Sequence, residues 1–260
     1  MRKLILGAAA ALLVCGLPAV ASAQSGYVGL SYTHDNVDPG DFDVDVGAVD
    51  ATAAFDFGSF GAQVGGGYAN LSPDGGDDAD DWHVDGHLFV RNDTWQFGGG
   101  VAYENVDFGG GDDGDVWTGA LETLFFQPNV TWGATLAYSD SSDFDTTAWN
   151  LNGEARYFLN DNLRIDGNIG LGTVDFGAGN DDNDAWSAGV GGEFQFASVP
   201  ISVFGGYEHY NLDVGGGPDL ENDALTIGAR WNFGGTLRDR DRSGANLHSG
   251  SFVQGILGAL

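Results

Sequence analysis

Two histidines and an aspartate alternate along one short segment, and their residue types are the ones best suited to chemistry in this chain. His83, Asp85 and His87 occupy every second position. Residues two apart in a β-strand share one face, so the three side chains would lie side by side. Two imidazoles and a carboxylate could bind a metal ion, or act as a base with an orienting partner. No serine nucleophile stands out beside them, and three alternating polar residues also suit an ordinary polar sheet face. We therefore expect that the chain is not an enzyme.

Runs of aspartate form a second candidate site. Carboxylates are the hard oxygen ligands that Ca²⁺ and Mg²⁺ prefer, although none of the runs has the spacing of an EF-hand loop. No lysine or arginine accompanies them, so their mutual repulsion predicts loosely bound divalent cations and no other cofactor. The candidate residues are Asp77, Asp78, Asp80, Asp81, Asp112, Asp113, Asp181 and Asp182.

A period of two residues indicates the elements that position these side chains. In the segment 82–91, Trp82, Val84, Leu88 and Val90 share one face and polar residues the other, which is typical of a β-strand. Most such segments have the length that a tilted strand needs to cross a bilayer. Twelve strands are predicted, at roughly 26–34, 48–57, 60–70, 82–91, 94–105, 116–126, 130–139, 147–158, 162–173, 185–196, 201–210 and 224–233.

The second of these strands is the least regular. Val44 and Val46 are out of phase with Ala51 and Phe55. A β-bulge, or a strand that starts at Ala48, would restore the alternation. Loss of this hairpin would leave ten strands, which is the alternative to twelve.

The connections between the predicted strands alternate in length. Short turns such as 92–93 and 160–161 alternate along the chain with longer acidic loops such as 74–81 and 177–184. Aromatic residues lie beside both kinds of connection and would form two girdles. The chain is therefore predicted to be all-β: a transmembrane antiparallel up-and-down β-barrel in the outer membrane, with periplasmic N- and C-termini. A soluble β-sandwich explains neither the girdles nor the rhythm of the connections.

The two ends of the chain differ from this pattern. Residues 1–23 have a basic start, an apolar stretch and a final Ala-Ser-Ala, as in a signal peptide. Lipid attachment at Cys15 is an alternative, which the bulky Val14 disfavours. We expect the barrel to span 24–233 and a periplasmic tail to span 234–260. That tail could be a disordered end, an inserted plug or an anchor to anionic cell-wall material.

Charge limits the partners. The formal net charge is −29, which excludes nucleic acid. The alternation places more carboxylates than guanidiniums on the inward faces, so the lumen should favour cations. Small inward residues favour an open, narrow pore over a filled barrel. The predicted pore-lining residues are Asp50, Asp85, Glu104, Glu122, Glu154, Asp166, Glu193, Glu208, Arg91, Arg156, Arg164, Arg230, His83 and His87.

The last predicted strand carries a resemblance to a known class. Residues 226–233, TIGARWNF, resemble the C-terminal β-signal of bacterial outer-membrane proteins, with a polar residue, a glycine and two aromatics spaced by one. Residues 237–245 are similar to a tail of porin-like barrels from alphaproteobacteria. The resemblance implies insertion by the barrel-assembly machinery and, usually, a passive pore. The chain departs from the common form because residues 234–260 follow the aromatic end.

These observations predict a porin-like diffusion channel of the outer membrane that prefers cations and has acidic extracellular loops. The expected partners are outer-membrane lipid and lipopolysaccharide, the assembly machinery during insertion, and small cationic or neutral solutes. One alternative is a plugged structural or adhesive barrel without conductance. Another is an outer-membrane hydrolase that uses the histidine segment.

Overall fold

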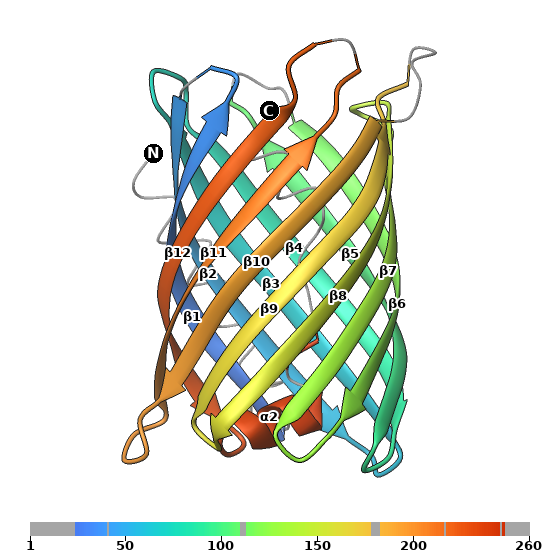
Figure 1. Ribbon diagram of the computed structural model, residues 1–260, viewed down its shortest axis with the longest axis vertical. Helices are drawn as coiled ribbons and strands as arrows, with labels where there is room; N and C mark the ends of the chain where they lie inside the picture. Colours follow the sequence, from blue (N-terminus) through green and yellow to red (C-terminus); the bar gives the residue numbers. More distant parts are fainter. Residues whose placement is uncertain are drawn as a thin grey trace.

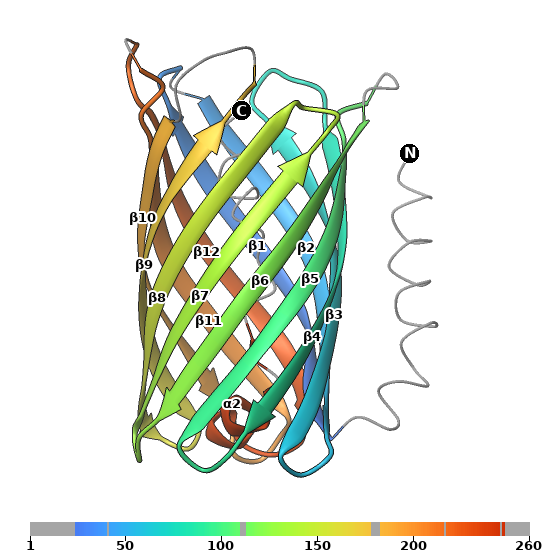
Figure 2. The same ribbon diagram turned by 90° about the vertical axis from the view of Figure 1, so that its right-hand side faces the viewer.

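The computed structural model describes residues 24–40, 42–109, 113–177, 183–215, 217–244 and 246–247, and the predicted signal peptide lies outside these ranges. They form a closed barrel with a short helix inside one end (Figures 1 and 2). No helix among them has the length and hydropathy needed to cross a bilayer. The elements are β1 (Ser25–Asp38), β2 (Phe42–Asp56), β3 (Phe60–Pro73), β4 (Ala79–Arg91), β5 (Trp95–Asp107), β6 (Asp113–Phe126), β7 (Val130–Ser141), β8 (Thr146–Asn160), β9 (Leu163–Asp175), β10 (Asn183–Gln195), β11 (Ile201–Leu212), β12 (Leu220–Phe233) and α2 (Leu237–Ser243).

The first and last strands close the barrel. Each strand is antiparallel to its sequence neighbours, and β1 pairs with β12 from Gly26 opposite Phe233 to Asp38 opposite Glu221. Closure leaves no strand edge with unpaired peptide groups. The predicted twelve-stranded barrel is confirmed, and the ten-stranded alternative is wrong.

The irregular second strand has a different explanation from the two that the sequence suggested. β2 starts at Phe42 and pairs with β1 and β3 without a register shift, so neither a bulge nor a start at Ala48 occurs. Val44 and Val46 instead point inward and pack near Val37 and Leu71. The inner face becomes apolar at this end, which reverses the expected polarity without changing the register.

The two ends of the barrel are called the turn end and the loop end. The turn end carries the connections that follow β2, β4, β6, β8 and β10, and α2 lies inside it (Figure 1). The loop end carries the connections that follow β1, β3, β5, β7, β9 and β11. Most strands extend further toward the loop end than predicted, so the acidic loops are shorter than expected: 74–78 replaces 74–81.

The outer surface is apolar between two aromatic girdles. Leu121 is 67% exposed and lies between Trp117 and Phe125 along β6. Rings pack in tilted pairs around the girdle near the loop end, where the ring centre of Tyr103 lies 5.2 Å from that of Trp82 and 4.9 Å from that of Trp117. An apolar band of this kind, flanked by aromatic rings, is the surface that lipid covers in transmembrane barrels. The barrel is therefore built to span a membrane.

Tyrosines of the loop-end girdle link the apolar band to the acidic rim. Tyr32 donates a hydrogen bond to Asp45 at 2.6 Å, and Tyr103 donates one to Asp115 at 2.6 Å. Each pair joins neighbouring strands. The ring stays in the apolar band while its hydroxyl reaches the polar side, as amphipathic aromatics do at a membrane boundary.

The lipid-facing assignment predicts how position along β6 and β7 affects stability. Leu121→Arg places a charge midway between the girdles and should lower the free energy of unfolding by about 2–4 kcal/mol, whereas a boundary position costs about 0–1 kcal/mol. Asp140→Arg, on the outer face at the loop end, is the matched control. Urea unfolding in phospholipid vesicles measures both, and equal losses would contradict the assignment.

Candidate functional site

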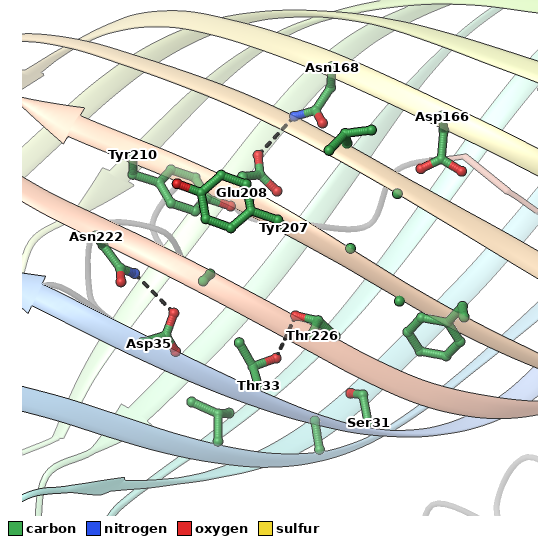
Figure 3. Close-up of a pocket in the computed structure, with 18 of the residues that line it drawn as sticks. Ser31, Thr33, Asp35, Asp166, Asn168, Tyr207, Glu208, Tyr210, Asn222 and Thr226 are labelled. Carbon is green, nitrogen blue, oxygen red and sulfur yellow. Dashed lines mark hydrogen bonds between the residues drawn. The ribbon is translucent and has the colours of Figure 1, made fainter.

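The lumen contains a polar chamber. Two cavities of about 460 Å³ and about 420 Å³ adjoin one another, since they share part of their lining. The shared residues are Ser31, Ala48, Ala69, Arg164, Asp166, Asn168, Glu208 and Arg230. Figure 3 shows side chains from β1, β9, β11 and β12 converging on the first cavity. The strand alternation places these polar groups inside and the apolar groups outside.

Amides hold the carboxylates in the part of the chamber nearer the loop end. Asn222 donates to Asp35 at 3.1 Å, and Asn168 donates to Glu208 at 2.8 Å (Figure 3). An amide satisfies a carboxylate oxygen but does not cancel its charge. Asp35 and Glu208 both line the first cavity. This part of the chamber is therefore electronegative.

Arginines gather toward the turn end. Arg230 contacts Glu193 at 3.0 Å, and Arg164 contacts Glu193 at 3.5 Å and Asp166 at 2.9 Å. The Arg230 guanidinium also lies 4.3 Å from the ring centre of Tyr27 and 4.2 Å from that of Phe204. Here positive and negative charges are paired. The lumen thus changes along its length from carboxylates that accept hydrogen bonds from amides to carboxylates that pair with arginines.

The histidine segment of β4 forms a buried chain of polar contacts, one member of which, Glu122, the sequence analysis did not group with the histidines. His87 lies 3.0 Å from Glu122 through Nδ1 and 3.5 Å from Asp85 through Nε2. Glu122 is on β6, two strands away, and the His87 ring reaches it across Gly100 of β5. His83 lines the second cavity instead. Among the described residues, no group of three or more histidines and carboxylates has an arrangement that could hold a metal ion.

The predicted pore-lining residues divide into three groups. Asp50, His83, Glu154, Arg156, Arg164, Asp166, Glu208 and Arg230 line the cavities. Asp85, His87, Glu104, Glu122 and Glu193 are buried on the inner face of the barrel. Arg91 lies at the turn end, where it pairs with Asp56 and donates to the carbonyl of Arg242 at 2.8 Å.

The candidate cation ligands do not converge in the described part of the chain. Asp80 faces outward and accepts hydrogen bonds from Tyr68 and Asn70, whereas Asp81 is buried on the inward face and lines the first cavity. Asp77 and Asp78 are exposed in the loop after β3, and Asp113 is exposed at the start of β6. Asp112, Asp181 and Asp182 lie outside the described residues.

Inward glycines leave space that larger side chains of neighbouring strands occupy, and these positions are called glycine beds. A Cβ atom at Gly189 would lie 2.5 Å from Oδ1 of Asn168, and one at Gly65 would lie 2.5 Å from Oδ2 of Asp85. At Gly100 it would lie 2.6 Å from Nδ1 of His87. The polar side chains therefore lie flat against the wall. Glycine opposite a large residue keeps space in the middle of a barrel that would otherwise fill with side chains.

The C-terminal tail occupies the turn end of the lumen. Residues 234–244 and 246–247, including α2, fold back inside the barrel (Figures 1 and 2). Asp241 is fully buried and contacts Arg156 at 2.7 Å, while Thr131 donates to it at 2.6 Å. The sequence left a disordered end, a plug and an anchor open, and this placement is that of a plug. The residues that the tail contacts are spread over distant strands, so no local sequence pattern predicts these contacts.

Comparisons with known proteins support the fold. An outer-membrane channel from Pseudomonas putida F1 has a TM-score of 0.60 and 13% identity, over 82% of this chain and 96% of that one. The translocator domain of the autotransporter NalP from Neisseria meningitidis has a TM-score of 0.58 and 12% identity, over 86% and 96%. The NanC porin has a TM-score of 0.55 and 11% identity, over 78% and 98%. No protein-family model and no curated protein matches the sequence. The chain thus has the outer-membrane β-barrel fold.

The glycine beds predict a difference between inward and outward substitutions. Gly189→Val would push Asn168 and Glu208 toward the lumen and should destabilise the barrel by about 1–3 kcal/mol, the range for overpacking. Gly119→Val is the matched control, because nothing lies within 4 Å of its Cβ position on the outer face. Valine suits a strand, so the control should be neutral or slightly stabilising. Unfolding of the two refolded variants checks this, and equal destabilisation would refute the beds.

Proposed function

We propose that the chain forms a diffusion channel of the outer membrane that prefers small cations. The observation that carries this proposal is the contrast between Asp35 and Glu208, which amides hold, and the arginines, which carboxylates pair. A cation that enters the chamber from the loop end meets carboxylates whose negative charge the amides do not cancel. An anion meets that charge before it can reach any guanidinium.

The electrostatics of the chamber strengthen this contrast. Low-dielectric walls around a water-filled space concentrate the field of the charges that line it. Rings of carboxylates select cations in channels in this way. The acidic loops would add to the effect by raising the local concentration of cations, including loosely held Ca²⁺ or Mg²⁺, at the entrance.

The proposed orientation places the loop end outside the cell and the turn end in the periplasm. Short periplasmic turns and longer outer loops are the usual arrangement of such barrels. The acidic loop end would then meet lipopolysaccharide and its counter-ions. The final strand, with its resemblance to the β-signal, would be the part that the assembly machinery recognises.

A structural barrel without conductance is the second candidate, because α2 occupies the turn end. A single measurement, the conductance of the folded barrel, distinguishes the two functions. A conducting, cation-selective step in a planar bilayer supports the channel. Complete silence of the folded barrel, with and without its tail contacts intact, would favour the structural role.

The source of selectivity is tested by removing the two amide-held carboxylates. In the double variant Asp35→Asn with Glu208→Gln, the permeability ratio of K⁺ to Cl⁻ should fall by about twofold or more, since the lining charge is lost. The ratio comes from the reversal potential in a KCl gradient. Glu221→Gln, which removes a carboxylate from the exposed outer face of β12, should leave the ratio unchanged.

Two results would count against this assignment. An unchanged ratio in the double variant would move the origin of selectivity away from the chamber. A wild-type preference for Cl⁻ would contradict the proposed cation preference itself.

A further inference from the structure

The contacts of the tail run round the inner circumference of the barrel. Besides Arg156 on β8 and Thr131 on β7, the tail contacts strands on the opposite side. Ser243 hydrogen-bonds Ser25 of β1, and Gln63 of β3 exchanges hydrogen bonds of 3.1 and 3.2 Å with the backbone of Leu247. Gln195 of β10 donates to the carbonyl of Gly235 at 3.1 Å. A segment with partners on so many strands crosses the opening rather than lying along one wall.

The part of the lumen that surrounds the described tail residues, here called the seat, is largely polar. Leu237 is fully buried, and Leu247 packs with Phe89, Leu124 and Phe126. The remaining contacts described above are hydrogen bonds and ion pairs. Groups of this kind exchange their partners for water at low net cost when a segment leaves its site. An apolar seat of similar size would hold the tail far more permanently.

One buried charge of the tail is poorly satisfied. Arg240 is fully buried, yet its contacts with Glu193 and Gln195 are long, at 3.5 and 3.4 Å, and its Nε and Nη1 atoms have no hydrogen-bond partner among the described residues. Glu193 is already shared with Arg164 and Arg230. Burial lowers the pKa of Arg240 to about 10, against the opposing pull of Glu193, so the group stays charged at neutral pH. Burying a charge without full compensation opposes the seated state.

Two glycines with positive φ angles precede the helix. Gly234 and Gly235 have φ angles of +88° and +110°, in the region that favours glycine. They turn the chain from the end of β12 back into the lumen. Thr236 then caps α2 through a capping box with Asp239. The helix is therefore joined to β12 through two residues whose backbone can adopt a wide range of conformations.

From this geometry we infer that the described part of the tail, 234–244 and 246–247, is a reversible gate, which closes the turn end of the channel when it occupies the lumen and opens it when displaced. The inference rests on the proposed function, because a gate needs a conducting path. The pair Asp241–Arg156 favours the seated tail, and the poorly satisfied Arg240 opposes it. Because the second term offsets part of the first, the free energy that holds the tail in place is reduced, and a displaced state can be populated.

A reversible covalent lock tests the gate within one folded protein. Ser25 and Ser243 are in direct side-chain contact, so cysteines at both positions can form a disulfide that fixes the end of α2 to β1. In planar bilayers, the oxidised Ser25→Cys, Ser243→Cys protein should conduct less than the same protein after addition of dithiothreitol. The single variant Ser243→Cys is the control, and wild type, whose only cysteine is Cys15, should not respond.

A charge variant tests the gate by shifting the equilibrium between the seated and the released tail toward the released state. Asp241→Asn leaves Arg156 with a weaker partner and should lower the ratio of seated to released tail by about tenfold or more, which raises the open fraction. Asp93→Asn, the same substitution on an exposed turn at the same end, should behave as wild type.

The outcomes separate the gate from the channel. Conduction that is equal in the oxidised and reduced double-cysteine protein would overturn the gate and leave the channel standing. Silence of the wild type, of both redox states and of Asp241→Asn, with the heat-modifiable mobility of a folded barrel, would overturn both. Lower conductance on oxidation, with a larger open fraction in Asp241→Asn, supports the gate.

Discussion

Inside a bilayer there is no water to hydrogen-bond the peptide groups, so a chain that crosses it with strands must close its sheet completely. The pairing of β1 with β12 meets this requirement over the full length of both strands. Once the sheet is closed, every residue faces either lipid or lumen, because the side-chain direction alternates. The apolar band, the girdles and the polar chamber all follow from that single constraint.

Closure also creates the conditions for the chemistry inside. A closed wall brings together side chains from strands that are far apart in sequence, as Asn222 on β12 and Asp35 on β1 illustrate. The wall must also leave room, and inward glycines such as Gly189 do so by accommodating a neighbouring side chain. The distribution of charge then decides what the remaining space attracts. Amide-held carboxylates lie nearer the loop end, and paired arginines lie nearer the turn end.

Features governed by local alternation could be predicted from the sequence. The strands, their inward and outward faces and the girdles depend on a period of two, which is visible along the chain. The start of β2 was predicted wrongly, because the outward face was assumed to be the only apolar one. Val44 and Val46 face the lumen, where they pack near Val37 and Leu71, and no period within β2 distinguishes an apolar interior from an apolar exterior.

Features governed by contacts between distant residues could not be predicted in this way. Arg156 pairs with Glu154, two residues away on its own strand, but it also contacts Asp241, 85 positions away. The tail carries alternating arginines and aspartates, a composition that suits a solvated end as well as a buried one. Its seat exists only when the barrel has closed and brought Thr131, Arg156 and Ser25 around one opening. The same closure that removes the exposed strand edges therefore builds the site that the tail occupies, so the tail can reach this site only in a completed barrel.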